Sequence, residues 1–115
     1  MSIKRISVGA RMSQGVSHGD TVFLAGQVAD DPSQDVSGQT KQILTKIDKL
    51  LAELGSDKSK LLSATIWLTD IRGFDEMNKV WDAWVSPGNT PARACVEAKL
   101  ARSNLLVEIG VIAAR

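Results

Sequence analysis

The sequence predicts an α+β domain in which two helices pack on one face of a mostly antiparallel or mixed sheet. Two segments repeat apolar residues at helical spacing, and several shorter segments alternate or run apolar as strands do. Clusters of Gly, Pro, Ser and Asp separate these segments as turns do. The expected order is β-β-β-α-β-α-β-β. A chain of 115 residues leaves no room for a second domain, so residues 1–115 are expected to form one.

Three strands are expected before the first helix, and two of them can be placed. One lies near residues 12–16 and the other, the apolar run TVFLAGQ, at residues 21–27. His18, Gly19 and Asp20 between them are suited to a turn that reverses the chain. These two strands are therefore expected to be neighbours.

The first helix is expected over residues 35–54. Its apolar side chains recur every three or four positions and so share one face; they are Val36, Ile43, Leu44, Ile47, Leu50, Leu51 and Leu54. Gly55 follows directly and is suited to ending a helix.

Residues 62–69 alternate between apolar and mixed side chains with a period of two, which is typical of a strand with two different faces. A second helix is expected after Asp70, with Asp75 and Glu76 in its first turn and Pro87 beyond its end. Its apolar stripe is Phe74, Met77, Val80, Trp81 and Trp84. Two strands follow, over residues 93–99 and 105–113.

Composition excludes several classes of function. Fourteen Lys and Arg against thirteen Asp and Glu give a net charge of +1, which argues against nucleic acid or a membrane surface as partner. One cysteine excludes an internal disulfide and a Cys-rich metal site, and one histidine disfavours a His-rich metal site or a Ser-His-Asp triad. The sequence contains no phosphate-binding loop, HExxH motif or EF-hand loop.

No apolar run is long enough to span a membrane, and the first residues lack the apolar segment of a signal peptide. A cytoplasmic location is therefore expected.

Arg93 stands on an apolar strand, where its side chain points the same way as that of Cys95. A buried guanidinium needs an anion, and its planar geometry suits a carboxylate. The residue is therefore either half of a structural ion pair or an anchor for an anionic ligand. The sequence offers no residue that would activate the Cys95 thiol. Cys95 is therefore expected to be a small buried side chain rather than a nucleophile.

Glu108 is a carboxylate within the apolar run 105–109. It could point inward and serve a water molecule or a proton, lie on the outer face of an antiparallel strand, or pair with Arg93. His18 is expected to be exposed and inert in its turn. Trp67, Trp81 and Trp84 are expected in the core or at a subunit interface.

The chain resembles the RidA (YjgF-type) family of enamine/imine deaminases. The resemblance rests on residues 25–28 (AGQV), 74–81 (FDEMNKVW), 91–96 (PARACV) and 107–113 (VEIGVIA), in matching order over nearly the whole chain. It implies a chorismate-mutase-like fold, assembled as a homotrimer with a cleft at each subunit interface. It also implies hydrolysis of 2-aminoacrylate-type enamines, through their imine tautomers, to 2-oxo acids and ammonia.

The resemblance also implies roles for individual residues, with no metal or organic cofactor. Arg93 would hold the substrate carboxylate and Glu108 would handle the attacking water. Cys95 would line the pocket, and Gly26 would contact the ligand through its backbone. Asn78 would correspond to an asparagine that the family carries in the second helix.

One departure concerns the family's Gly-Pro-Tyr segment. This chain has Ala10, Arg11 and Met12 there, and it contains no tyrosine at all. Met12 therefore takes the place of a hydroxyl that would hold substrate or water, which places the chain nearer the divergent members. The alternative to an enzyme is a trimeric protein that binds 2-oxo acids or related carboxylates without turnover. An RNA-cleaving role, attached to some relatives, is disfavoured by the near-neutral charge.

Overall fold

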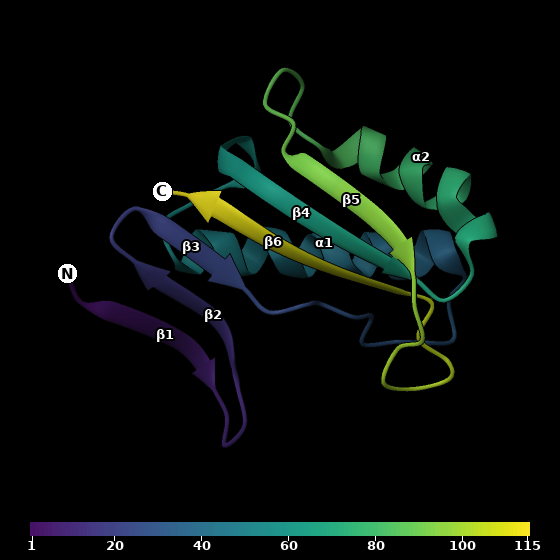
Figure 1. Ribbon diagram of the computed structural model, residues 1–115, viewed down its shortest axis with the longest axis horizontal. Coiled ribbons are helices and arrows are strands. Elements are labelled where there is room, and N and C mark those ends of the chain that lie inside the picture. Colours follow the sequence, from purple (N-terminus) through teal and green to yellow (C-terminus); the bar gives the residue numbers. More distant parts are fainter.

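Two helices cover one face of a six-stranded sheet in the computed structural model, which describes all residues 1–115 (Figure 1). The strands are β1 (Ile3–Val8), β2 (Ser13–His18), β3 (Thr21–Leu24), β4 (Leu61–Leu68), β5 (Ala92–Glu97) and β6 (Val107–Ala114). The helices are α1 (Val36–Glu53) and α2 (Phe74–Trp84). This is the predicted α+β class and element order. The strand order is β1-β2-β3-β6-β4-β5.

The sheet is mixed, because one neighbouring pair of strands is parallel. β4 and β5 run in the same direction, and α2 forms the crossover between them. Every other pair of neighbouring strands is antiparallel. α2 therefore lies beside β5, at one edge of the sheet, while β1 forms the opposite edge (Figure 1).

Helix α1 begins and ends where the sequence predicts. The Asp35 carboxylate accepts a hydrogen bond from the Gly38 amide at 2.9 Å and so caps the first turn. Gly55, directly after the capping residue Leu54, has a φ of 78°, a conformation that glycine adopts without strain.

Helix α2 was expected to begin directly after Asp70, but it begins at Phe74. The Asp70 side chain accepts from the Arg72 amide and caps a 3₁₀ turn, Ile71–Gly73, that precedes the helix. Asp75 and Glu76 then occupy the first turn, as predicted. The cap belongs to the short turn rather than to the helix itself.

Strand β3 ends at Leu24 rather than at residue 27. Ala25 still donates its amide to the Gln14 carbonyl, but Gln27 exchanges both backbone hydrogen bonds with Ile109 of β6, at 2.8 and 3.1 Å. The chain therefore crosses toward β6 just after β3. The last two strands, expected at 93–99 and 105–113, lie at Ala92–Glu97 and Val107–Ala114.

The hydrophobic core fills the space between the helices and the covered face of the sheet. Ile43 and Ile47 of α1 pack there with Ile66 of β4 and Ile109 of β6, and all four are fully buried. The other face has no helix over it. Phe23 on that face is 45% exposed, which leaves apolar surface open to contact.

Gln39 is a buried polar residue of α1 that fixes two loops. Its side-chain nitrogen lies within 3.2 Å of the carbonyl oxygens of Pro32, Gln34 and Asn104, and its oxygen accepts from the Leu106 amide at 2.9 Å. It thus ties the segment before α1 and the segment before β6 to the same helix.

We expect Gln39→Leu to destabilise the fold by about 2–4 kcal/mol, because the buried backbone groups around it lose their partners. Gln42→Leu is the matched control, since Gln42 also bonds backbone atoms but at the surface. It should cost under about 1 kcal/mol. Urea unfolding of both variants measures the difference, and equal losses would contradict the role given to Gln39.

Candidate functional site

Arg93 lies on the edge strand β5 and points toward α2. It is paired in register with Ala64, whose side chain belongs to the core on the helix-covered face. Its Nη1 donates a hydrogen bond to Oδ1 of Asn78 at 2.7 Å. The guanidinium carbon lies 5.3 Å from the ring centroid of Trp81 and 5.8 Å from that of Phe74. Both distances are those of cation–π contacts.

The three partners of Arg93 come from one face of α2. Phe74, Asn78 and Trp81 are spaced i, i+4 and i+7, so the helix presents them in a row along the edge strand. We call these residues and Arg93 the arginine cluster. Because the crossover sets α2 beside β5, the fold brings the cluster together within one chain.

The Arg93 guanidinium has no carboxylate partner. The ion pairs of the chain are Lys46 with Asp30 and Arg72 with Asp70. The structural ion pair left open by the sequence is therefore not formed. A half-buried cation, held in place by an amide oxygen and two aromatic rings, can accept an anion.

Glu108 lies on the face of the sheet that the helices leave uncovered. Its strand neighbours Val107 and Ile109 are fully buried on the helix side, so the Glu108 side chain points the other way. It stands directly opposite Trp67 of β4. No hydrogen bond or ion pair engages its side chain.

Gly26 lets the Glu108 side chain lie against the backbone after β3. A Cβ atom at position 26 would overlap the Glu108 carboxylate. Gly110 differs from Gly26 in this respect, because a Cβ atom there would meet the Trp67 ring at 3.5 Å, an ordinary contact distance. We call Gly26, Trp67 and Glu108 the glutamate cluster.

The two clusters lie on opposite faces of the sheet. Within one chain Glu108 is therefore not an inward carboxylate and does not pair with Arg93; it lies on the outer face, which is the alternative that the sequence left open. The cause is the register: Glu108 pairs with Trp67 and Trp67 with Val96, whereas Arg93 and Cys95 share the other face of β5. One subunit thus keeps its two candidate groups apart.

The other candidate residues also lie in different parts of the molecule. Cys95 is half-buried on the face of Arg93, and burial raises its pKa, although the Arg93 charge opposes this. Met12 is 46% exposed in the turn between β1 and β2, at the edge of the sheet away from β5. His18 is exposed at the end of β2, as expected.

The sequence does not predict the aromatic partners of Arg93. Phe74 and Trp81 belong to the predicted apolar stripe of α2, and Trp81 is buried in the core. The i, i+4, i+7 spacing with Asn78 was the available signal. Trp67 opposite Glu108 was equally hidden, because the sequence does not reveal strand register.

Comparison with known proteins agrees with this fold. The family model described as Endoribonuclease L-PSP matches residues 2–115. A RutC family protein of Haemophilus ducreyi is 46% identical over 112 residues, which cover 97% of this chain and 96% of the relative.

Solved structures share the fold over nearly the whole chain. A member of the YjgF protein family from Neisseria meningitidis is 45% identical with a TM-score of 0.97, covering 100% of this chain and 96% of its own. A protein of the conserved Rid family from Yersinia pestis is 28% identical with a TM-score of 0.90, covering 99% and 100%. No helix of this chain has the length and apolar character that a membrane span needs.

Cys95 is expected to react slowly with thiol reagents, because its raised pKa leaves less thiolate at a given pH. The midpoint of its alkylation rate against pH, followed with iodoacetamide, should lie above the ordinary value of 9.0. Arg93→Gln should move it higher still, since the guanidinium charge favours the thiolate. A midpoint below that of a free cysteine peptide would instead indicate an activated nucleophile.

Proposed function

Because the chain belongs to the YjgF/RutC family matched by the Endoribonuclease L-PSP model, we propose that it hydrolyses imines of small amino acids to 2-oxo acids and ammonia. The observation that most supports this is the free guanidinium of Arg93, fixed by Asn78 and two rings. In this proposal the guanidinium binds the carboxylate of a 2-imino acid such as 2-iminopropanoate.

Each part of the reaction has a candidate group. Arg93 binds the carboxylate in bidentate fashion and sets the position of the imine carbon. Glu108 accepts a proton from a water that attacks the carbon of the protonated imine, which gives a carbinolamine with a hydroxyl and an amino group. Glu108 then returns this proton to the nitrogen. The C–N bond breaks as the hydroxyl proton passes to the departing ammonia, which leaves the 2-oxo acid and an ammonium ion. Imines hydrolyse readily, so positioning of one water supplies much of what catalysis needs.

The site proposed here is shared between subunits of a homotrimer. The arginine cluster lies at the β5 edge, and the glutamate cluster lies on the uncovered face, so a neighbouring chain packed against that face would bring the two together. Apolar side chains exposed on the uncovered face, such as Phe23 and Val96, favour such packing. Met12 and Gly26 would then enter the cleft from the chain that supplies Glu108, and Cys95 and Asn78 from the chain that supplies Arg93.

Two other functions are alternatives to imine hydrolysis. A binding protein for 2-oxo acids would also use Arg93, but a second carboxylate near the ligand would weaken anion binding. The family model is described as an endoribonuclease, so RNA cleavage is the second alternative. It would need a basic surface, which a net charge of +1 does not favour.

The deciding experiment is a coupled assay in which an amino-acid oxidase generates the imine. The disappearance of the imine is followed with and without the protein.

Arg93→Lys should lower kcat/KM for imine hydrolysis by about tenfold or more, and Arg93→Ala further, because lysine loses the two-pronged contact with the carboxylate. Arg72→Lys is the matched control, since Asp70 already neutralises that guanidinium. It should keep the parental rate. If Arg93→Lys also keeps the parental rate, then Arg93 does not hold the carboxylate.

Glu108→Gln should lower imine hydrolysis by roughly 100- to 10,000-fold, because the amide cannot accept the proton of the attacking water. Affinity for a 2-oxo acid should be unchanged or slightly higher, since a like charge has left the site. Glu53→Gln, an exposed position at the end of α1, serves as control. Parental hydrolysis by a folded Glu108→Gln protein would require the role of Glu108 to be withdrawn.

Mixing inactive variants tests whether the site is shared. Arg93→Ala and Glu108→Gln subunits, unfolded and refolded together, should regain roughly a quarter of the parental activity, because some interfaces then combine an intact arginine with an intact glutamate. Light scattering should give about three times the 12.4 kDa monomer mass. A monomer, or mixed trimers without activity, would contradict the shared site.

A further inference from the structure

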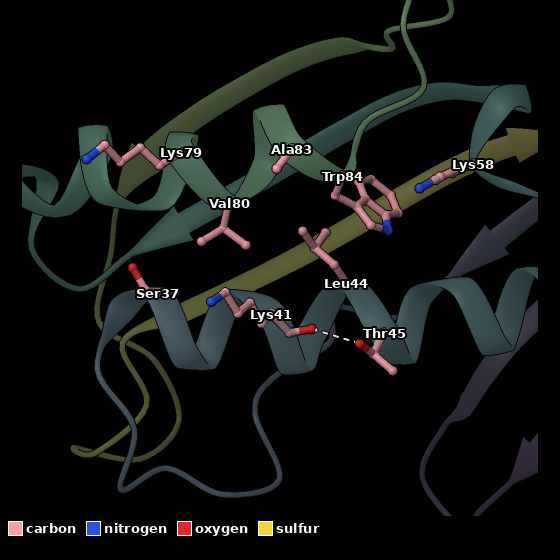
Figure 2. A pocket seen from close by; sticks show the side chains of 9 residues that line it. All are labelled: Ser37, Lys41, Leu44, Thr45, Lys58, Lys79, Val80, Ala83 and Trp84. Carbon is pink, nitrogen blue, oxygen red and sulfur yellow. Dashed lines mark hydrogen bonds between the residues drawn. The ribbon is translucent and has the colours of Figure 1, made fainter.

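A groove between α1 and α2 lies outside the two clusters (Figure 2). It has a volume of about 720 Å³, which lies within the range of small-molecule sites. Its floor includes the apolar side chains of Leu44, Val80 and Trp84. The groove is on the helix side of the molecule, so packing of another subunit against the uncovered sheet face would leave it accessible.

Three lysines surround this groove, and each comes from a different element. Lys41 belongs to α1, Lys79 to α2, and Lys58 to the 3₁₀ turn Lys58–Lys60 before β4. None of them forms an ion pair. Figure 2 shows Lys41 and Lys79 toward one end of the groove, and Lys58 beyond the Trp84 ring at the other. Their like charges repel one another, and a bound anion would relieve this repulsion.

Two acidic side chains near the groove form hydrogen bonds with residues that line it. Asp48 accepts a hydrogen bond from the indole nitrogen of Trp84 at 3.0 Å, and Glu76 accepts one from the Ser37 hydroxyl at 3.2 Å. The bond to Asp48, together with the Trp81 ring at 5.4 Å, holds the Trp84 indole in a fixed orientation. The groove therefore offers a preformed apolar surface between cationic ends.

We propose that this groove binds a small anion with an apolar, ring-sized body, whose acidic group is a carboxylate or a phosphate. The acidic group lies between Lys41 and Lys79, where two ammonium groups from facing helices reach it. The ring lies along Val80 and Trp84. Lys58, whose ammonium stands 5.4 Å from the Trp84 ring centroid, closes the far end.

Calorimetric titration with 1-naphthoate, 1-naphthyl phosphate and neutral 1-naphthol tests the proposal. These titrations use the Arg93→Ala protein, so that binding at the arginine cluster does not contribute and the outcome is independent of imine hydrolysis. Both anions, or one of them, should bind, and affinity should fall as salt rises. The stronger of the two identifies the acidic group. Equal binding of 1-naphthol, or no binding at millimolar ligand, would overturn the proposal.

Charge removal at the groove provides the second measurement. Lys41→Gln combined with Lys79→Gln should weaken binding of the anion by about tenfold or more, because charge-assisted contacts are lost. The control combines Lys60→Gln with Lys99→Gln, which removes the same charge from exposed positions that do not line the groove. Equal weakening by the two pairs would mean that the anion responds to net charge alone, and the groove would not be its site.

Discussion

The arrangement of this molecule depends on one constraint, which is that both helices cover the same face of the sheet. Side chains in each strand alternate between that covered face and the open one. Ile66 and Ile109 fill the core on the covered face, and their strand neighbours Trp67 and Glu108 must then point to the open face. The location of every candidate group on the sheet follows from this alternation.

Much of the fold could be predicted from the sequence because the signals involved are local. Helix α1 is specified by its apolar spacing, the Asp35 cap and the glycine beyond its end, and all three act within a few residues. The start of α2 was placed less well, since the local signal at Asp70 caps a different turn. The parallel pairing of β4 and β5 involves residues far apart in the chain, and the sequence left the sheet type open between antiparallel and mixed.

The candidate site was predictable residue by residue but not as an arrangement. Arg93 and Glu108 are unusual in apolar strands and could be selected on that ground alone. Their relation depends on register, which is set by pairing between β4, β5 and β6 and is invisible to periodicity. The resemblance to a family of trimeric proteins implied clefts between subunits, and the separation of the two residues in one chain is compatible with that.

The three tryptophans have a consequence for spectroscopy, because the chain contains no tyrosine. Ultraviolet emission therefore reports on tryptophan alone, and each indole samples a different part of the molecule. Trp67 lies half-buried on the open face, Trp81 is in the core against the Arg93 guanidinium, and Trp84 lines the groove between the helices. Single replacements of these indoles would assign the emission to three local probes, for the open face of the sheet, for the arginine and for the helix pair.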